Sequence, residues 1–182
     1  MVGGDTVRSK TIVVDVSLIG EVEKGRLALR SGAKCGDAIF VTGVLGGSIK
    51  GKHLNFTPRV NEAREILKKF KINSMIDISD GLALDLKRIL EASGVGSCVY
   101  ESAIPLSRDA VSINNALYDG EDYELLFTMS VKEARRFIRT TLNKMKTPVT
   151  LIGEIVSKKN GCKIIRVNGK EEDMKIKGYL HF

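Results

Sequence analysis

Two carboxylates and a hydroxyl follow one another where a short apolar run meets a helical pattern. In the stretch MIDISDGL, Asp77 stands between two isoleucines, and Ser79 and Asp80 come directly after them. A carboxylate buried in an apolar strand is costly unless it is paired, hydrogen-bonded or bound to a cation. Two carboxylates on a strand-to-helix turn suit Mg²⁺, and the first amides of the helix suit phosphate oxygens. The alternative is that Ser79 or Asp80 caps the helix, which leaves Asp77 unexplained.

Two further segments combine acidic residues with turn signals. The opening GGDT places Asp5 beside exposed amides, and Gly4 lets the backbone come close to a ligand, although an ordinary turn has the same composition. The segment YDGEDYELLF contains four acids ahead of an apolar strand: Asp119, Glu121, Asp122 and Glu124. This cluster is either a solvated surface turn or a place for a metal or a cationic ligand group.

Two single residues are also candidates for ligand contact. Arg30, in GRLALR, is either a surface charge or a phosphate contact. Tyr179, in the terminal GYLHF, either docks on the core with its neighbours or stacks on a planar ligand.

Alternating strands and helices must position these candidates. Apolar and β-branched runs predict strands at residues 11–20, 38–43, 74–78, 96–100, 123–129, 147–156 and 162–169. Helical spacing of apolar residues predicts helices at 58–70, 82–93 and 130–145, with Ser130 as an N-cap and Gly94 as a stop. This alternation predicts a layered α/β or α+β domain.

Composition limits the possible partners. A chain of 182 residues that is 43% hydrophobic can bury a core of ordinary size. The net charge of +7 suits either nucleic acid or a phosphorylated small molecule, but the basic residues are spread thinly and no stacking platform accompanies them, so we expect no nucleic-acid partner. The three cysteines lack paired spacing, and no apolar run reaches the roughly 20 residues of a membrane span. We therefore expect a cytoplasmic protein without a membrane partner.

Taken in order, six motifs resemble the thiamine-monophosphate kinases, a branch of the superfamily that contains aminoimidazole ribonucleotide synthetase. The motifs are GGDT, GRLALRSGAKCGDAIFVTG, MIDISDGLALDLKRILEASGVG, GEDYELLFT, TLIGEIV and GYLHF. The resemblance implies a mixed sheet layered with helices. It also implies a transfer of the γ-phosphoryl group of ATP, with Mg²⁺ as cofactor, to the phosphate of thiamine monophosphate. Because the acceptor is already an anionic oxygen, no protein general base is required.

The resemblance also implies roles for single residues. The metal would be bound by Asp5, Asp77 and Asp80. ATP would be contacted by Gly4, Asp5, Arg30 and Ser79. The thiamine part would be contacted by Glu121 and Tyr179. Two positions depart from the family pattern, since Asp119 stands where glycine is usual and Gly47 stands where an acidic residue is common.

Members of this family carry a further N-terminal domain ahead of GGDT. By this resemblance, residues 1–22 are the last strand of that domain and residues 23–182 are the C-terminal α/β domain. The chain would then be inactive alone and would act as a homodimer or with a separate N-terminal-domain chain, because an unpaired strand edge favours association. Two alternatives are a non-catalytic module that binds nucleotide or thiamine phosphate, and another ATP-dependent enzyme of the same superfamily.

Overall fold

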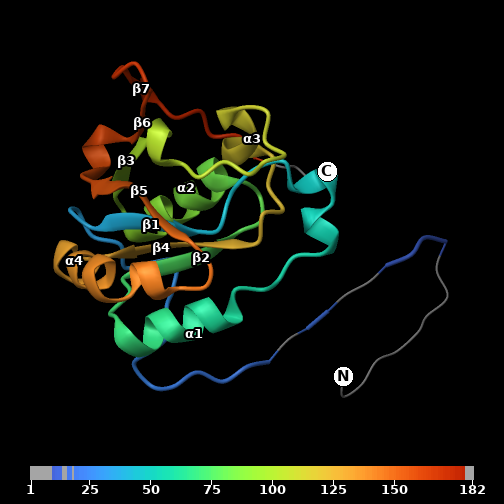
Figure 1. Ribbon diagram of the computed structural model, residues 1–182, viewed down its shortest axis with the longest axis horizontal. Helices are drawn as coiled ribbons and strands as arrows, with labels where there is room; N and C mark the ends of the chain where they lie inside the picture. Colours follow the sequence, from blue (N-terminus) through green and yellow to red (C-terminus); the bar gives the residue numbers. More distant parts are fainter. Residues whose placement is uncertain (1–9, 14–15, 18, 179–182) are drawn as a thin grey trace.

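A seven-stranded mixed sheet forms the body of this computed structural model, which describes residues 10–13, 16–17 and 19–178 (Figure 1). The strands are β1 Ala38–Thr42, β2 Ser74–Ile78, β3 Gly96–Tyr100, β4 Glu124–Met129, β5 Val149–Val156, β6 Cys162–Ile165 and β7 Glu171–Asp173. Their order in the sheet is β2-β4-β1-β5-β3-β6-β7, in which β3 and β6 are parallel and the other neighbours are antiparallel. The expected layered fold with a mixed sheet is confirmed.

Helices cover both faces of the sheet. They are α1 Val60–Lys69, α2 Leu82–Ser93, α3 Ile113–Tyr118 and α4 Val131–Thr140. Residues of α2 and α3 share one core with the sheet, and residues of α1 and α4 share the other; in Figure 1, α2 and α3 lie in the upper part of the body and α1 and α4 in the lower part. Because strand side chains alternate between faces, Ile39 and Val41 of β1 join the core under α2 and α3. Phe40 instead packs with Phe127 and Phe137 in the core beneath α1 and α4.

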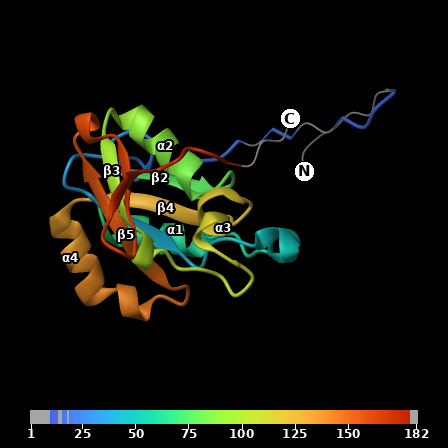
Figure 2. The same cartoon turned by 90° about the horizontal axis from the view of Figure 1, so that it is seen from above.

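Two short elements were not expected from the sequence, and the described residues of one expected strand lie outside any strand. The helix α3 begins with a capping box between Ser112 and Asn115, and β7 pairs with β6. The described residues of 11–20 are not in a strand, and Ile12 and Ile19 are almost fully exposed. A strand needs a neighbour for its backbone groups, whereas the described residues of this segment extend away from the body in both views (Figures 1 and 2). The domain boundary at residue 22 stays a prediction.

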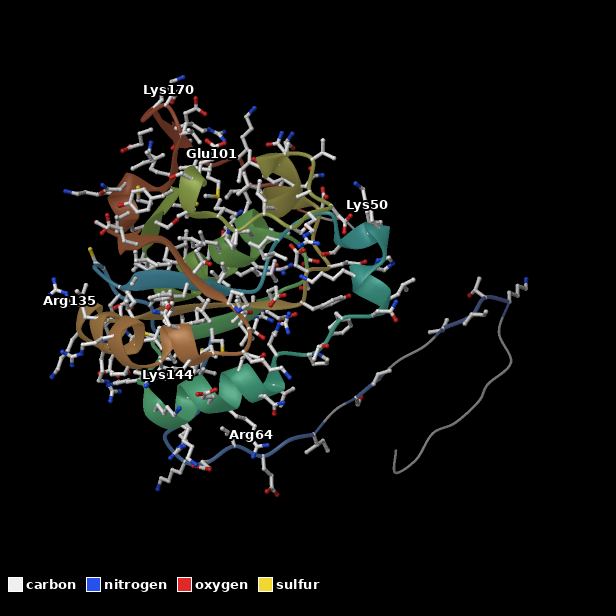
Figure 3. The ribbon with its side chains drawn as sticks, viewed as in Figure 1. Lys50, Arg64, Glu101, Arg135, Lys144 and Lys170 are labelled. Carbon is white, nitrogen blue, oxygen red and sulfur yellow. The ribbon has the colours of Figure 1, made fainter. Side chains whose placement is uncertain are left out.

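Charged side chains surround the body rather than gathering on one element. Figure 3 labels six that come from different parts of the chain: Lys50, Arg64, Glu101, Arg135, Lys144 and Lys170. Among the helices of the described ranges, none combines the length and the apolar character that a membrane span requires.

Candidate functional site

The candidate site is built where β2 ends and α2 begins. The carbonyl oxygen of Ile78 accepts a hydrogen bond from the N–H of Tyr123 at 2.8 Å, and that of Ser79 accepts one from the N–H of Glu121 at 2.7 Å. This close approach requires a glycine at position 120, because a Cβ atom there would lie 2.6 Å from the Ser79 oxygen. The structure therefore brings Glu121 next to the turn that carries Ser79.

Three of the expected carboxylates affect the pKa of one phenol group, that of Tyr123. Burial raises the pKa of Tyr123, and the negative charges of Glu121, Asp77 and Asp80 raise it further. The hydrogen bonds from residues 121 and 123 to residues 79 and 78 bring the two segments that carry these carboxylates together. Their convergence combines residues from the end of β2 with residues from the loop before β4.

The burial expected for Asp77 is wrong. Its side chain is exposed, whereas those of Ile76 and Ile78 on either side are buried. The strand β2 is the outermost of the described sheet at this end, and its alternation turns Asp77 away from the core. Within the described ranges no hydrogen bond or ion pair occupies the Asp77 carboxylate. Asp77 therefore needs no ligand to compensate for burial, but it is accessible to one.

The capping interpretation of Ser79 and Asp80 is also wrong. The N-cap of α2 is Gly81, and no side chain caps this helix end. Instead Asp85, which is fully buried in the first turn of α2, accepts hydrogen bonds from the N–H groups of Ser79 at 3.0 Å and Asp80 at 2.9 Å. Arg88 forms ion pairs with both Asp80 and Asp85. A carboxylate inside the helix thus holds the turn that precedes it.

Glu124 is a buried structural residue rather than part of a ligand-binding cluster. It is 1% exposed. Arg59 donates two hydrogen bonds of 2.7 Å to its carboxylate, Lys52 donates one of 3.0 Å and the Thr42 hydroxyl donates one of 2.8 Å. Burial acts to raise the pKa of Glu124, but these donors and cations outweigh it and lower the pKa. The cations that this acid needs are supplied by the chain itself.

The carboxylates of Asp119 and Asp122 bind the glycine loop that follows β1. Asp122 is 1% exposed and accepts hydrogen bonds from the Gly46 N–H at 2.9 Å and from the Ser48 hydroxyl at 2.5 Å. The N–H of Gly47 donates to Asp119 at 3.4 Å, so the two departures from the family pattern meet in space. Asp122 is therefore part of neither a solvated surface turn nor a ligand-binding cluster.

Asp122 should make stability depend on pH. Burial raises its pKa from 3.8 to about 6, although the bonds from Ser48 and Gly46 act to lower it. Because the pKa is raised in the folded state, folding is favoured while the group keeps its proton, and this contribution is lost as the pH rises from about 4 to about 6. In the unaltered chain we expect this group to lower the unfolding free energy by about 2 kcal/mol over that range, and in Asp122→Asn we expect that decrease to be absent. Urea unfolding at a series of pH values measures it, and equal pH profiles for both proteins would contradict it.

Arg30 is not brought next to the turn. Its carbonyl oxygen accepts a hydrogen bond from the hydroxyl of Ser93, which ends α2, whereas Ser79 and Asp80 precede the start of that helix. The 12 residues of α2 span about 18 Å. The role of Arg30 in ATP binding stays a prediction. Gly4, Asp5 and Tyr179 lie outside the described residues, and their roles stay predictions as well.

The described residues fit a magnesium site in which other groups, such as waters and substrate phosphates, complete the coordination. Asp77 and Asp80 offer the hard oxygen ligands that Mg²⁺ prefers. In the part of the chain that the structure describes, no group of three acidic, histidine or cysteine side chains is arranged to hold a metal ion. Mg²⁺ is often held by one or two carboxylates, with waters and substrate phosphates as the remaining ligands. Two carboxylates at this turn are consistent with that mode of binding.

Sequence comparison places this chain among known proteins. Residues 39–164 match the family model "AIR synthase related protein, C-terminal domain". The thiamine-monophosphate kinase of Rhodopirellula baltica is 34% identical over 98% of the chain and 58% of the relative. That of Bacillus subtilis is 34% identical over 100% of the chain and 64% of the relative. The chain thus spans about 60% of the length of these curated relatives.

Solved structures show the same fold. The thiamine-monophosphate kinase of Stenotrophomonas maltophilia is 26% identical with a TM-score of 0.67, over 82% of this chain and 55% of that one. AaThiL complexed with AMPPCP and TMP is 28% identical with a TM-score of 0.66, over 85% of this chain and 54% of that one. The Escherichia coli hydrogenase maturation protein HypE, at 17% identity and a TM-score of 0.70 over 86% of this chain and 54% of its own, shares the fold.

Proposed function

Because the chain belongs to the AIR synthase related family, through the C-terminal domain that residues 39–164 match, we propose that it carries part of the active site of a thiamine-monophosphate kinase. The reaction would transfer the γ-phosphoryl group of ATP to thiamine monophosphate. The observation that carries this proposal is that hydrogen bonds hold the loop of Glu121 against the turn that carries Asp77, Ser79 and Asp80. The similarity to thiamine-monophosphate kinases supports the choice of substrates.

The residues of this site would act by positioning and by charge. Asp77 and Asp80 would hold Mg²⁺, which would neutralise the negative charge of the phosphates. The hydroxyl of Ser79 contacts ATP, and the carboxylate of Glu121 attracts the thiazolium cation of the second substrate. The acceptor is already an anionic phosphate oxygen, so the chain needs no general base.

The complete reaction would need more than the described residues. Gly4 and Asp5 would add contacts to the metal and ATP, Arg30 to ATP, and Tyr179 to the thiamine part. We propose that the chain is inactive alone and works as a homodimer or with a separate N-terminal-domain chain. A cytoplasmic location is part of the proposal and is supported by Cys35, Cys98 and Cys162, which are free thiols.

A direct assay tests this function. Purified chain, Mg-ATP and thiamine monophosphate are incubated with and without the separately expressed N-terminal domain of a thiamine-monophosphate kinase, and thiamine diphosphate is followed by chromatography. We expect product only in the mixture. Product from the chain alone would overturn the proposed inactivity while supporting the reaction. No binding of thiamine monophosphate in isothermal titration, with or without Mg-ATP, would overturn the function itself.

The variant Asp80→Asn tests the metal site separately. We expect Mg²⁺ to lower the dissociation constant of ATP for the unaltered chain. In the variant we expect this magnesium effect to be about tenfold smaller, or about 1.4 kcal/mol. Isothermal titration of ATP with and without MgCl₂ measures it. Asp173→Asn is the matched control, since Asp173 lies on β7 and its side chain is 83% exposed. Equal magnesium dependence in both variants would exclude Asp80 as a ligand.

A further inference from the structure

An aromatic pair lies beside the candidate site and outside both cores. The rings of Phe56 and Tyr123 are stacked, with centroids 4.1 Å apart and planes at 27°. Phe56 is 37% exposed, and neither ring belongs to the two hydrophobic clusters. A stacked pair of one exposed and one half-buried ring removes less apolar surface from water than a core contact does. Core packing therefore does not account for the pair.

The backbone at this place is held in an unfavourable conformation. Glu121 has a φ of 54° and Tyr123 a φ of 51°, both in the left-handed region that residues other than glycine rarely adopt. The hydrogen bonds from their N–H groups to the carbonyl oxygens of Ser79 and Ile78 stabilise it. Strain of this kind is concentrated at ligand-binding sites, where it fixes side-chain directions. Here it affects one ring of the pair and the neighbouring carboxylate.

The loop that carries the other ring, that of Phe56, is held by ion pairs at both of its ends. Phe56 lies in the loop between Lys52 and Arg59, and both of these cations bind the carboxylate of Glu124. Glu124 directly follows Tyr123 in the chain. One buried acid thus fixes both ends of the loop beside the start of β4. The ion pairs fix the loop on either side of Phe56, and this keeps the Phe56 ring against Tyr123.

We propose that Phe56 and Tyr123 form the stacking surface for the cationic ring of the substrate. The inference rests on the proposed function and adds the residues that select a cation. An aromatic face attracts a cation through its quadrupole. Glu121 lies two residues from Tyr123, and their loop is hydrogen-bonded to the turn that carries Asp77 and Asp80, so negative charge lies beside the pair. The ligand class is a planar, positively charged heteroaromatic ring, of which the thiazolium of thiamine monophosphate is the case at hand.

Isothermal titration of the full chain with two ligands tests the inference. One ligand is thiamine monophosphate, and the other is its neutral analogue in which carbon replaces the thiazolium nitrogen. The ratio of the two dissociation constants measures the preference for the cation. Phe56→Leu keeps an apolar side chain and removes the aromatic face, so we expect this preference to fall about 3- to 10-fold. Phe56→Tyr should retain it.

Tyr100→Leu is the matched control, because Tyr100 is also 37% exposed but lies on β3, near α4. We expect this control to keep the preference of the unaltered chain. An unchanged preference in Phe56→Leu would overturn the stacking role while the binding of thiamine monophosphate still supported the proposed function. The absence of binding to the unaltered chain would overturn both.

Discussion

Replacing Arg59 by alanine is expected to lower the free energy of unfolding by about 3–5 kcal/mol. The substitution leaves the Glu124 carboxylate buried, with only Lys52 and the Thr42 hydroxyl as partners. A buried charge that loses its main counter-ion keeps its desolvation cost and loses the attraction that compensated for it. Chemical denaturation of the variant and the unaltered chain at pH 7 measures the difference.

The same variant should respond to pH in a defined direction. The pKa of Glu124 lies below 4.5 in the unaltered chain, so its ion pairs stabilise the fold above that pH and this contribution is lost as the pH falls through the lowered pKa. Without Arg59 the carboxyl should take up a proton more readily. The difference in unfolding free energy between the two proteins should therefore narrow as the pH falls from 7 towards 4.

An exposed ion pair provides the control for Arg59. Lys69 and Glu65 are one helical turn apart on α1, with side chains 51% and 40% exposed. Lys69→Ala should cost less than about 0.5 kcal/mol, because exposed pairs are well solvated. Adding Glu124→Gln to Arg59→Ala removes the buried charge and should restore part of the loss. A cost for Arg59→Ala no larger than that for Lys69→Ala would contradict this account of the buried pair.

Local patterns predicted most of the sheet because each strand carries its own signal. The strand β2 was expected at residues 74–78 and occupies Ser74–Ile78, since Gly, Asp and Ser mark its end and isoleucines alternate within it. The segment 11–20 has a stronger run of β-branched residues, yet its described residues form no strand. The difference is the neighbour: β2 pairs with β4, whereas pairing for 11–20 is absent from the described sheet. Local composition reports strand propensity and cannot report the partner.

The candidate site was predictable in its residue types but not in its contacts. Asp77, Asp80 and Glu121 were identified from turn signals and the family resemblance, and the structure brings the loop of Glu121 beside the turn that carries the two aspartates. Glu124 was named in the acidic cluster, but its pairing with Arg59 was missed because 65 residues separate the two, and no local pattern links such a pair. Phe56 and Tyr123 were missed for the same reason.

Asp85 is different, because its signal was present in the sequence. Leu82, Leu86 and Ile89 form the apolar face of α2, and Asp85 stands three or four residues from the first and last of them. A carboxylate on the buried face of a helix requires a partner. That partner is the turn before the helix, through the N–H groups of Ser79 and Asp80.

Replacing Asp85 by alanine should therefore loosen the candidate site as well as the fold. Two amides of the turn would lose their acceptor and Arg88 would lose one of its two carboxylates, at a cost of about 3 kcal/mol in unfolding free energy. Hydrogen exchange at the amides of Ser79 and Asp80 should become faster than at other amides in α2. The control Glu91→Ala, in an exposed pair with Lys87 on the same helix, should change neither measurement.

Asp85→Asn separates the shape of this acceptor from its charge. Burial raises the pKa of Asp85 against the bonds from the Asp80 amide and Arg88, so its negative charge is held at a cost. Asparagine keeps an oxygen for the turn and avoids that cost, but its NH₂ group takes the place of the oxygen that accepts from Arg88 and cannot accept a hydrogen bond. We expect Asp85→Asn to lower the unfolding free energy by less than half as much as Asp85→Ala does. We also expect hydrogen exchange at the amides of Ser79 and Asp80 to stay slow. If the asparagine variant exchanged as fast as the alanine variant, charge rather than shape would hold the turn, and Arg88 would be the residue that positions Asp80 for magnesium.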